Sequence, residues 1–121
     1  MKAIINDEVL SIRSDGKYVR DYLYVKDVAE GYLMIAKKIE SIVGQAFNFG
    51  SKETISVLAL IKIVEKAVKR KLKYKILNNA QNEIPYQSLD YSKIKKKIGW
   101  EPKKSLKKTS KSILAWYKKV I

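Results

Sequence analysis

The sequence predicts a mixed α/β fold, and three observations support this class. Segments rich in β-branched and aromatic residues alternate with segments whose apolar residues recur at helical spacing. The hydrophobic fraction is 46%, and no low-complexity run interrupts the chain, which is typical of a folded globule. The length suits a single domain, so we expect residues 1–121 to form one domain.

The first elements are predicted to be a β-hairpin. Residues 9–13 and 18–25 are both β-prone, and they flank a turn at 14–17 that contains Asp15 and Gly16. An Asp-Gly pair between two such runs is a strong short-range hairpin signal. Because a two-stranded ribbon is barely stable alone, we expect the hairpin to pack against another element.

A helix is predicted next, over residues 28–38. Asp27 is placed to cap its N-terminus, and Glu30 would complete a capping box three residues later. Gly31 costs a helix about 1 kcal/mol relative to alanine, so we expect a close neighbour beside it. The apolar stripe of this helix has four members: Val28, Tyr32, Ile35 and Ile39.

The middle of the chain predicts a strand, a helix and a second strand. Residues 45–49 are expected to form a short strand that ends at Gly50, and Ser56 is expected to cap a helix that reaches about Arg70. Residues 71–76 alternate lysine with apolar residues, which predicts a half-buried edge strand. The apolar face of the helix has five members: Val57, Leu60, Ile61, Val64 and Val68.

Two more helices are predicted after a polar loop at residues 78–88, which gives about four helices in total. Asp90 or Ser92 begins the first of them, Gly99 suits a left-handed C-terminal cap, and Pro102 forbids continuation. The last helix is expected to have a serine cap and four inner residues: Ser105, then Leu106, Ile113, Trp116 and Val120.

The composition excludes several kinds of site. The chain has no cysteine and no histidine, so disulfides, zinc-thiolate centres and imidazole catalysis are ruled out. No apolar run approaches the roughly 18 to 20 residues that span a bilayer, and the first residues lack the apolar core of a signal peptide. We therefore predict a cytoplasmic protein that does not enter a membrane.

The net charge of +14 is confined to one half of the chain. Residues 1–50 hold seven basic and seven acidic groups, whereas residues 51–121 hold nineteen basic and five acidic groups. Only three of the 26 basic residues are arginine, and nucleic-acid readers rely on arginine for bidentate contacts. The surplus lysine therefore favours a solvated surface, and a small lysine-rich nucleic-acid-binding module that uses residues 93–119 is the alternative.

Four signatures in the chain occur together in a known family. They lie at residues 12–27 (IRSDGKYVRDYLYVKD), 46–50 (AFNFG), 98–102 (IGWEP) and 116–117 (WY). In order and spacing they resemble the C-terminal portion of the NAD-dependent nucleotide-sugar epimerases and dehydratases, the extended short-chain dehydrogenase/reductase family. Within this family, residues 82–93 are more similar to the 4,6-dehydratases that act on CDP- or GDP-sugars than to the galactose epimerases.

The resemblance implies that this chain is one of two functional parts found in the enzymes of the family. In the family an N-terminal Rossmann domain holds NAD(P) and the catalytic residues, and a smaller C-terminal region holds the nucleotide-sugar. This chain resembles the second part, and its five glycines include no G-x-G-x-x-G fingerprint. We therefore expect no cofactor in this chain, NAD(P) in the complete enzyme and no catalysis by the chain alone.

Further expectations concern completeness and partners. Met1 falls where similar enzymes are still finishing a helix, which indicates a fragment. We therefore expect a nucleotide-diphosphate sugar as ligand, and either the missing Rossmann half or a second copy of the chain as partner. Residues 57–68 and 46–49 are the faces expected to be left free.

Arg20 is the first candidate site residue. In similar enzymes the arginine of this Arg-Asp-aromatic motif contacts the diphosphate, and a planar fork of donors suits that role. The alternative is an ion pair with Asp21 or Asp27. Arg13 and Ser14 lie where the family places part of its nucleotide pocket, and the alternative for them is an ordinary surface position.

Asn82 and Glu83 complete the candidate site. Many members of the family carry an Arg-Pro pair shortly before the acidic residue that Glu83 matches, but this chain has Ala80 and Gln81 there. In the family the arginine of this pair supplies a second contact to the diphosphate. Because this chain lacks that arginine, the resemblance does not imply the second contact here. Asn82 and Glu83 either approach the sugar or base, or belong to a polar loop.

The Tyr22 to Lys26 stretch has the Tyr-x-x-x-Lys spelling of the family's catalytic pair. That pair requires both side chains on one face of a helix. Here the two residues precede the predicted cap, and in a strand they would stand about 13 Å apart. We therefore predict no catalytic residue in this chain.

Overall fold

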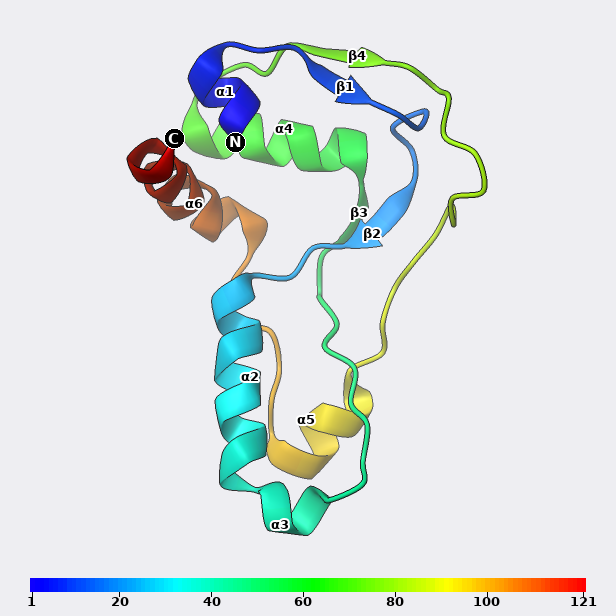
Figure 1. Cartoon of the computed structure of the whole chain (residues 1–121), viewed down its shortest axis with the longest axis vertical. Coiled ribbons are helices and arrows are strands. Elements are labelled where there is room, and N and C mark those ends of the chain that lie inside the picture. Colours follow the sequence, from blue (N-terminus) through cyan, green and yellow to red (C-terminus); the bar gives the residue numbers. More distant parts are fainter.

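The computed structural model describes residues 1–121 and divides into two parts (Figure 1). The strand part holds α1, all four strands, α4 and α6, and the helical arm holds α2, α3 and α5. Both termini lie in the strand part. The elements are α1 (Lys2–Asn6), β1 (Leu10–Ile12), β2 (Val19–Asp21), α2 (Val25–Lys37), α3 (Ile39–Ile42), β3 (Thr54–Ser56), α4 (Val57–Val68), β4 (Tyr74–Ile76), α5 (Ser92–Ile98) and α6 (Leu106–Val120).

The predicted hairpin is wrong, because β1 and β2 belong to different sheets. β1 pairs in parallel with β4, and β2 pairs in antiparallel with β3. The turn between β1 and β2 is instead tied to itself and to α4: Ser14 Oγ accepts the Gly16 N–H at 3.2 Å, and the Gly16 carbonyl accepts the Leu58 N–H at 3.1 Å. These bonds direct the chain toward α4 rather than back along β1.

The other two strand predictions have different outcomes. Residues 45–49 do not form a strand, because Phe47 and Phe49 pack against buried helical residues and no neighbouring strand pairs with this segment. The predicted strand at 71–76 is confirmed over β4. It is exposed rather than half-buried, with Tyr74 at 43% and Ile76 at 47% exposure.

The helical arm contains one compact apolar cluster. Its buried members are Ile42, Ile94, Ile98 and Trp100. The expected close neighbour of Gly31 is confirmed: a Cβ there would collide with the Phe49 ring and would lie 2.8 Å from Trp100 Nε1. The glycine thus allows α2 to approach this cluster.

The predicted capping box at Asp27 is wrong. α2 begins at Val25, three residues before the predicted start, with Tyr24 as its N-cap. The Asp27 side chain is buried, and its Oδ2 accepts the backbone N–H groups of Lys103 at 2.9 Å and Lys104 at 2.8 Å. Glu30 pairs with the Lys103 Nζ at 2.8 Å. Both acidic residues therefore hold the connection between α5 and α6 rather than a helix end.

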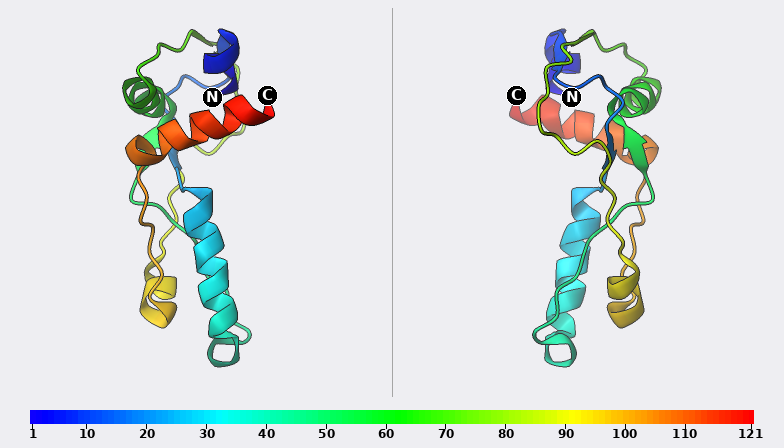
Figure 2. Two further views of the ribbon diagram at one scale, coloured as in Figure 1. Left: turned by 90° about the vertical axis from the view of Figure 1, so that its left-hand side faces the viewer. Right: turned by 90° about the vertical axis from the view of Figure 1, so that its right-hand side faces the viewer.

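The remaining caps are confirmed, but the inner face of α6 is not. Ser56 Oγ accepts the Ala59 N–H, and Gly99 takes a left-handed conformation with φ of 81°. Trp116 and Val120 are exposed instead of buried. α6 packs on α4 and lies across the top of the helical arm (Figure 2). Its buried residues are Thr109, Ser110 and Leu114.

Candidate functional site

The candidate site lies at β2, which has neighbours on both sides. One side pairs with β3. On the other side the Val19 N–H donates to the Pro85 carbonyl at 2.9 Å, and the Val19 carbonyl accepts the Gln87 N–H at 3.1 Å. The polar loop that contains Glu83 is thereby fixed beside Arg20.

Asp21 strengthens this arrangement. Its Oδ1 accepts the Thr54 hydroxyl at 2.5 Å, and its Oδ2 accepts the Leu89 N–H at 2.7 Å. The carboxylate therefore joins β2 to β3 and to the end of the loop. No ion pair joins Arg20 to Asp21 or to Asp27, so neither alternative partner is used.

Two guanidinium groups meet at one carboxylate. Arg13 Nη2 donates to Glu83 Oε1 at 2.8 Å, and Arg20 Nη2 lies 3.8 Å from Glu83 Oε2. The Arg20 side chain is 26% exposed and that of Arg13 76% exposed. Arg20 also donates to the Val19 carbonyl at 2.8 Å, and its guanidinium carbon lies 5.8 Å from the centre of the Tyr18 ring. Three of the five predicted site residues thus form one cluster.

Arg13 reaches this cluster because the end of β1 lies against the polar loop. Its carbonyl accepts the N–H groups of Asn79 at 2.7 Å and Ala80 at 3.0 Å. The backbone of Arg13 is therefore next to Ala80, the position where the family resemblance leads one to expect an arginine. The structure places the Arg13 guanidinium, from another segment, close to that position.

Ser14 and Asn82 lie near the cluster, but neither contacts an arginine through a hydrogen bond. Ser14 is 7% exposed, and its hydroxyl oxygen accepts the Gly16 N–H. Asn82 is exposed and has a positive φ of 56°. Both residues shape turns, one after Arg13 and one before Glu83.

Tyr22 lies in the extended segment before α2, as the sequence predicted, whereas Lys26 lies in the first turn of α2 and not before it. Tyr22 is therefore not one helical turn from Lys26. Burial raises the pKa of the Tyr22 phenol, and the nearby Arg20 charge opposes this change. A tyrosine that acts as a general base needs a lowered pKa, so its surroundings do not suit catalysis.

An apolar groove of about 500 Å³ lies between this extended segment and α6. Tyr22, Leu23, Ile113 and Trp116 are among its lining residues, and Lys26 and Lys104 contribute cations to it. The sequence did not predict the groove, because the buried face of α6 differs from the expected one.

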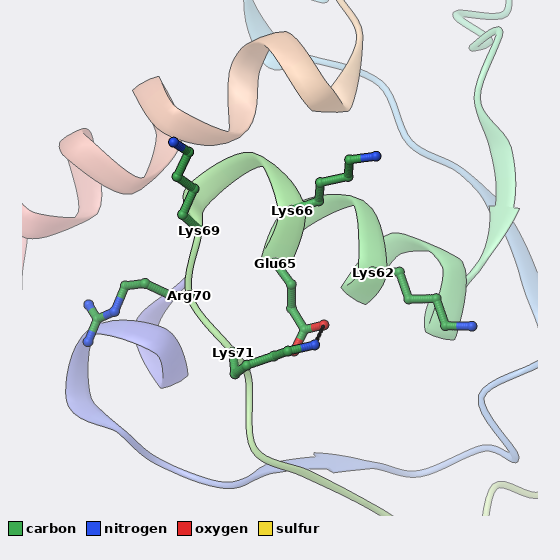
Figure 3. Close-up of a pocket in the computed structure, with 6 residues that line it drawn as sticks. All are labelled: Lys62, Glu65, Lys66, Lys69, Arg70 and Lys71. Carbon is green, nitrogen blue, oxygen red and sulfur yellow. Dashed lines mark hydrogen bonds and ion pairs between the residues drawn. The ribbon is translucent and has the colours of Figure 1, made fainter.

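A second hollow, of about 510 Å³, lies at the C-terminal end of α4 and is lined entirely by charged residues (Figure 3). The Glu65 carboxylate is occupied, because it accepts the Leu72 N–H at 2.9 Å and pairs with Lys71 at 3.4 Å. Cations at a helix C-terminus complement the helix dipole, which accounts for this basic surface. Its lining residues are Lys62, Glu65, Lys66, Lys69, Arg70 and Lys71.

Two other kinds of feature are absent from the structure. No group of three or more acidic side chains is arranged to hold a metal ion. None of the helices combines the length and the apolar character that crossing a membrane requires.

The fold and the comparisons with known proteins define the class as the C-terminal portion of an extended short-chain dehydrogenase/reductase. The model of the family described as GDP-mannose 4,6 dehydratase matches residues 3–113. The chain therefore belongs to the NAD-dependent epimerase/dehydratase family, and it corresponds to the C-terminal portion of that family.

Two curated relatives are 4-epimerases of UDP-sugars. The chain is 32% identical to UDP-glucose 4-epimerase of Bacillus subtilis, over 84% of this chain and 30% of the relative. It is 30% identical to UDP-glucuronate 4-epimerase of Thermodesulfobacterium geofontis, over 100% of this chain and 37% of the relative. The chain thus spans about a third of the length of these relatives.

Solved structures agree with this assignment. UDP-glucuronic acid 4-epimerase from Bacillus cereus, in complex with UDP-glucuronic acid and NAD, is 26% identical, with a TM-score of 0.89 over 99% of this chain and 38% of that chain. The fold also matches dTDP-glucose 4,6-dehydratase from Bacillus anthracis, with a TM-score of 0.81 over 98% of this chain and 37% of that chain, at 21% identity. Epimerases and dehydratases share this fold.

Proposed function

We propose that this chain binds the nucleotide-diphosphate sugar of an NAD-dependent epimerase or 4,6-dehydratase, with Arg20 as a contact of the diphosphate. The observation that carries the proposal is the position of Arg20. Its side chain is mostly buried on a strand that has neighbours on both sides, and its guanidinium already lies beside a carboxylate. A guanidinium held in this way suits phosphate oxygens, because its donors match their geometry.

The other predicted residues have complementary roles in this proposal. Arg13 and Glu83 complete the charged cluster around Arg20. Ser14 and Asn82 act through the turns that they shape. The chain binds and orients the ligand, and the resemblance assigns catalysis to the other part of the enzyme.

The chemistry of the complete enzyme follows from the family. NAD would accept a hydride from a sugar hydroxyl carbon and return it after a proton transfer or an elimination. The glycines of this chain do not form the turn that cradles a dinucleotide, so its residues do not fit NAD. We therefore assign none of the hydride chemistry to this chain.

The test is a calorimetric titration of the purified chain with UDP-glucose, UDP and uridine. We expect the two diphosphates to bind and uridine not to bind. Arg20→Ala should weaken UDP-glucose binding by about tenfold or more, because hydrogen bonds from charged groups contribute about 1.5 to 3 kcal/mol. CDP-glucose, GDP-mannose and dTDP-glucose, titrated in parallel, rank the nucleotide bases and test the expected preference for CDP- or GDP-sugars.

Arg70→Ala is the matched control. It removes the same side chain and the same charge, but from the basic hollow beside α4. An equal loss in both variants, or no loss in Arg20→Ala, would contradict the proposal. A DNA duplex at two salt concentrations tests the alternative: binding that falls steeply with salt and ignores Arg20→Ala would favour the lysine-rich nucleic-acid-binding module.

A further inference from the structure

Glu83 occupies the donors that an anionic ligand would use. Its two carboxylate oxygens face different guanidinium groups, with Oε1 at 2.8 Å from Arg13 and Oε2 at 3.8 Å from Arg20. The two pairs therefore differ in strength: the first is a direct hydrogen bond, and the second lies beyond hydrogen-bond distance. A negative group already lies in the site.

We propose that Glu83 is an internal counter-anion that a bound diphosphate displaces from Arg20, while Arg13 keeps hold of it. The inference rests on the proposed function, because it concerns the same arginine. It assigns to Glu83 a role opposite to that of a ligand contact: the carboxylate holds the site ready and competes with the ligand.

The geometry supports an exchange at Arg20 rather than at Arg13. Arg20 has only one direct hydrogen bond, to the Val19 carbonyl, so its remaining donors can turn to phosphate oxygens. Arg13 holds Oε1 of Glu83 closely, and its own backbone is fixed by the N–H groups of Asn79 and Ala80. A diphosphate can therefore approach Arg20 without first breaking the stronger pair.

Electrostatics defines the effect of Glu83 on affinity. Together, the two guanidinium groups and the carboxylate leave one net positive charge at the site. A diphosphate that enters beside Glu83 meets a like charge, and two such charges about 6 Å apart repel by roughly 1 to 3 kcal/mol at the effective dielectric of a partly exposed site, that is, about five- to 150-fold in affinity. Rearrangement of the flexible carboxylate reduces this range.

The test is Glu83→Gln, which retains the shape and one acceptor oxygen but removes the charge. We expect calorimetry of the purified chain to give about three- to tenfold tighter binding of UDP and of inorganic pyrophosphate. Binding that is unchanged or weaker in Glu83→Gln would overturn the inference. Circular dichroism of the variant confirms that it is folded before titration.

Glu101→Gln is the matched control. Glu101 also lies between two cations, at 3.4 Å from Lys52 and 2.9 Å from Lys95, and it belongs to the connection between α5 and α6. Its substitution changes the net charge of the chain by the same amount. Equal tightening in both variants would indicate a general charge effect and would overturn the inference.

A second comparison tests the role of Arg13 in the exchange. Without Arg13, Glu83 is free to pair fully with Arg20, so Arg13→Ala should weaken UDP binding about threefold or more. In the Glu83→Gln background the same substitution should cost less. Equal losses in both backgrounds would show that Arg13 acts on the ligand directly and would overturn the exchange. The proposed function fails separately, if Arg20→Ala retains full affinity.

Discussion

Asp27 is a single buried carboxylate that holds two distant segments together. It is 3% exposed, and its Oδ2 accepts the backbone N–H groups of Lys103 and Lys104. Asp27→Ala should lower the free energy of unfolding by about 2 to 4 kcal/mol, because it leaves two partly buried backbone donors without their acceptor. Urea unfolding followed by tryptophan fluorescence measures the change.

Two other substitutions show whether the acceptor is the cause. Asp27→Asn retains an acceptor oxygen, so its loss of stability should be smaller than that of Asp27→Ala. Asp7→Ala removes an exposed carboxylate whose partner is Lys73, and it should leave the unfolding midpoint nearly unchanged. If Asp7→Ala and Asp27→Ala were equally destabilising, the bonds to residues 103 and 104 would not explain the effect.

Sequence motifs singled out candidate site residues, but they did not specify the contacts between them. The Arg-Asp-aromatic motif singles out Arg20, and the acidic position after the loop singles out Glu83. Their meeting depends on the register in which residues 85–87 lie beside Val19, and no local pattern specifies such a register. Asp27 was misassigned because an aspartate just before a predicted helix and one in its first turn have the same sequence pattern.

Gly31 controls how closely α2 can approach the apolar cluster of the helical arm. Helix propensity alone predicts that Gly31→Ala stabilises the chain by about 1 kcal/mol. We expect the opposite, a loss of about 1 to 3 kcal/mol, because a Cβ would collide with Phe49 and crowd Trp100. Thermal unfolding by circular dichroism measures the difference.

Ala36→Gly is the control on the same helix. Ala36 is exposed, so this change should show only the propensity cost of about 1 kcal/mol. A stabilised Gly31→Ala variant would mean that the packing beside α2 adapts to the added methyl group. The two variants thus separate packing from propensity.

Helices were predictable where caps accompany periodicity, and strands were less so. α4 and α5 begin and end close to the predicted residues, because Ser56 and Gly99 mark boundaries by local backbone chemistry. The short helices α1 and α3 have no such signals and were not predicted. Strand pairing depends on distant partners, so an Asp-Gly turn between β-prone runs led to a hairpin that the chain does not form.

At the scale of the whole molecule, the buried apolar residues do not belong to one continuous core. The helical arm is organised around Ile94 and Trp100, whereas the strand part buries Ile12, Ile61 and Leu114 separately. β2 and its neighbours lie where these two parts meet (Figure 1). The arginine cluster is therefore positioned by contacts from both halves of the sequence, which explains why local patterns could not specify it.

The distribution of apolar surface predicts that the purified 121-residue chain self-associates. The faces expected to be free are partly covered, because α4 packs on α6 and Phe49 packs on Trp100. Large apolar side chains are exposed elsewhere, with Leu33 at 65% and Trp116 at 58%. Apolar surface that a chain cannot bury within itself favours association.

Light scattering at increasing concentration measures this association. We expect the mean mass to rise above that of the 13.9 kDa monomer. Trp116→Lys should reduce the rise if the groove between the extended segment and α6 takes part, since this residue lines it. Leu33→Lys on α2 gives the same change in charge outside the groove and separates the two surfaces. A monodisperse monomer at high concentration would contradict the prediction, and it would mean that the exposed apolar residues are too dispersed to form an interface.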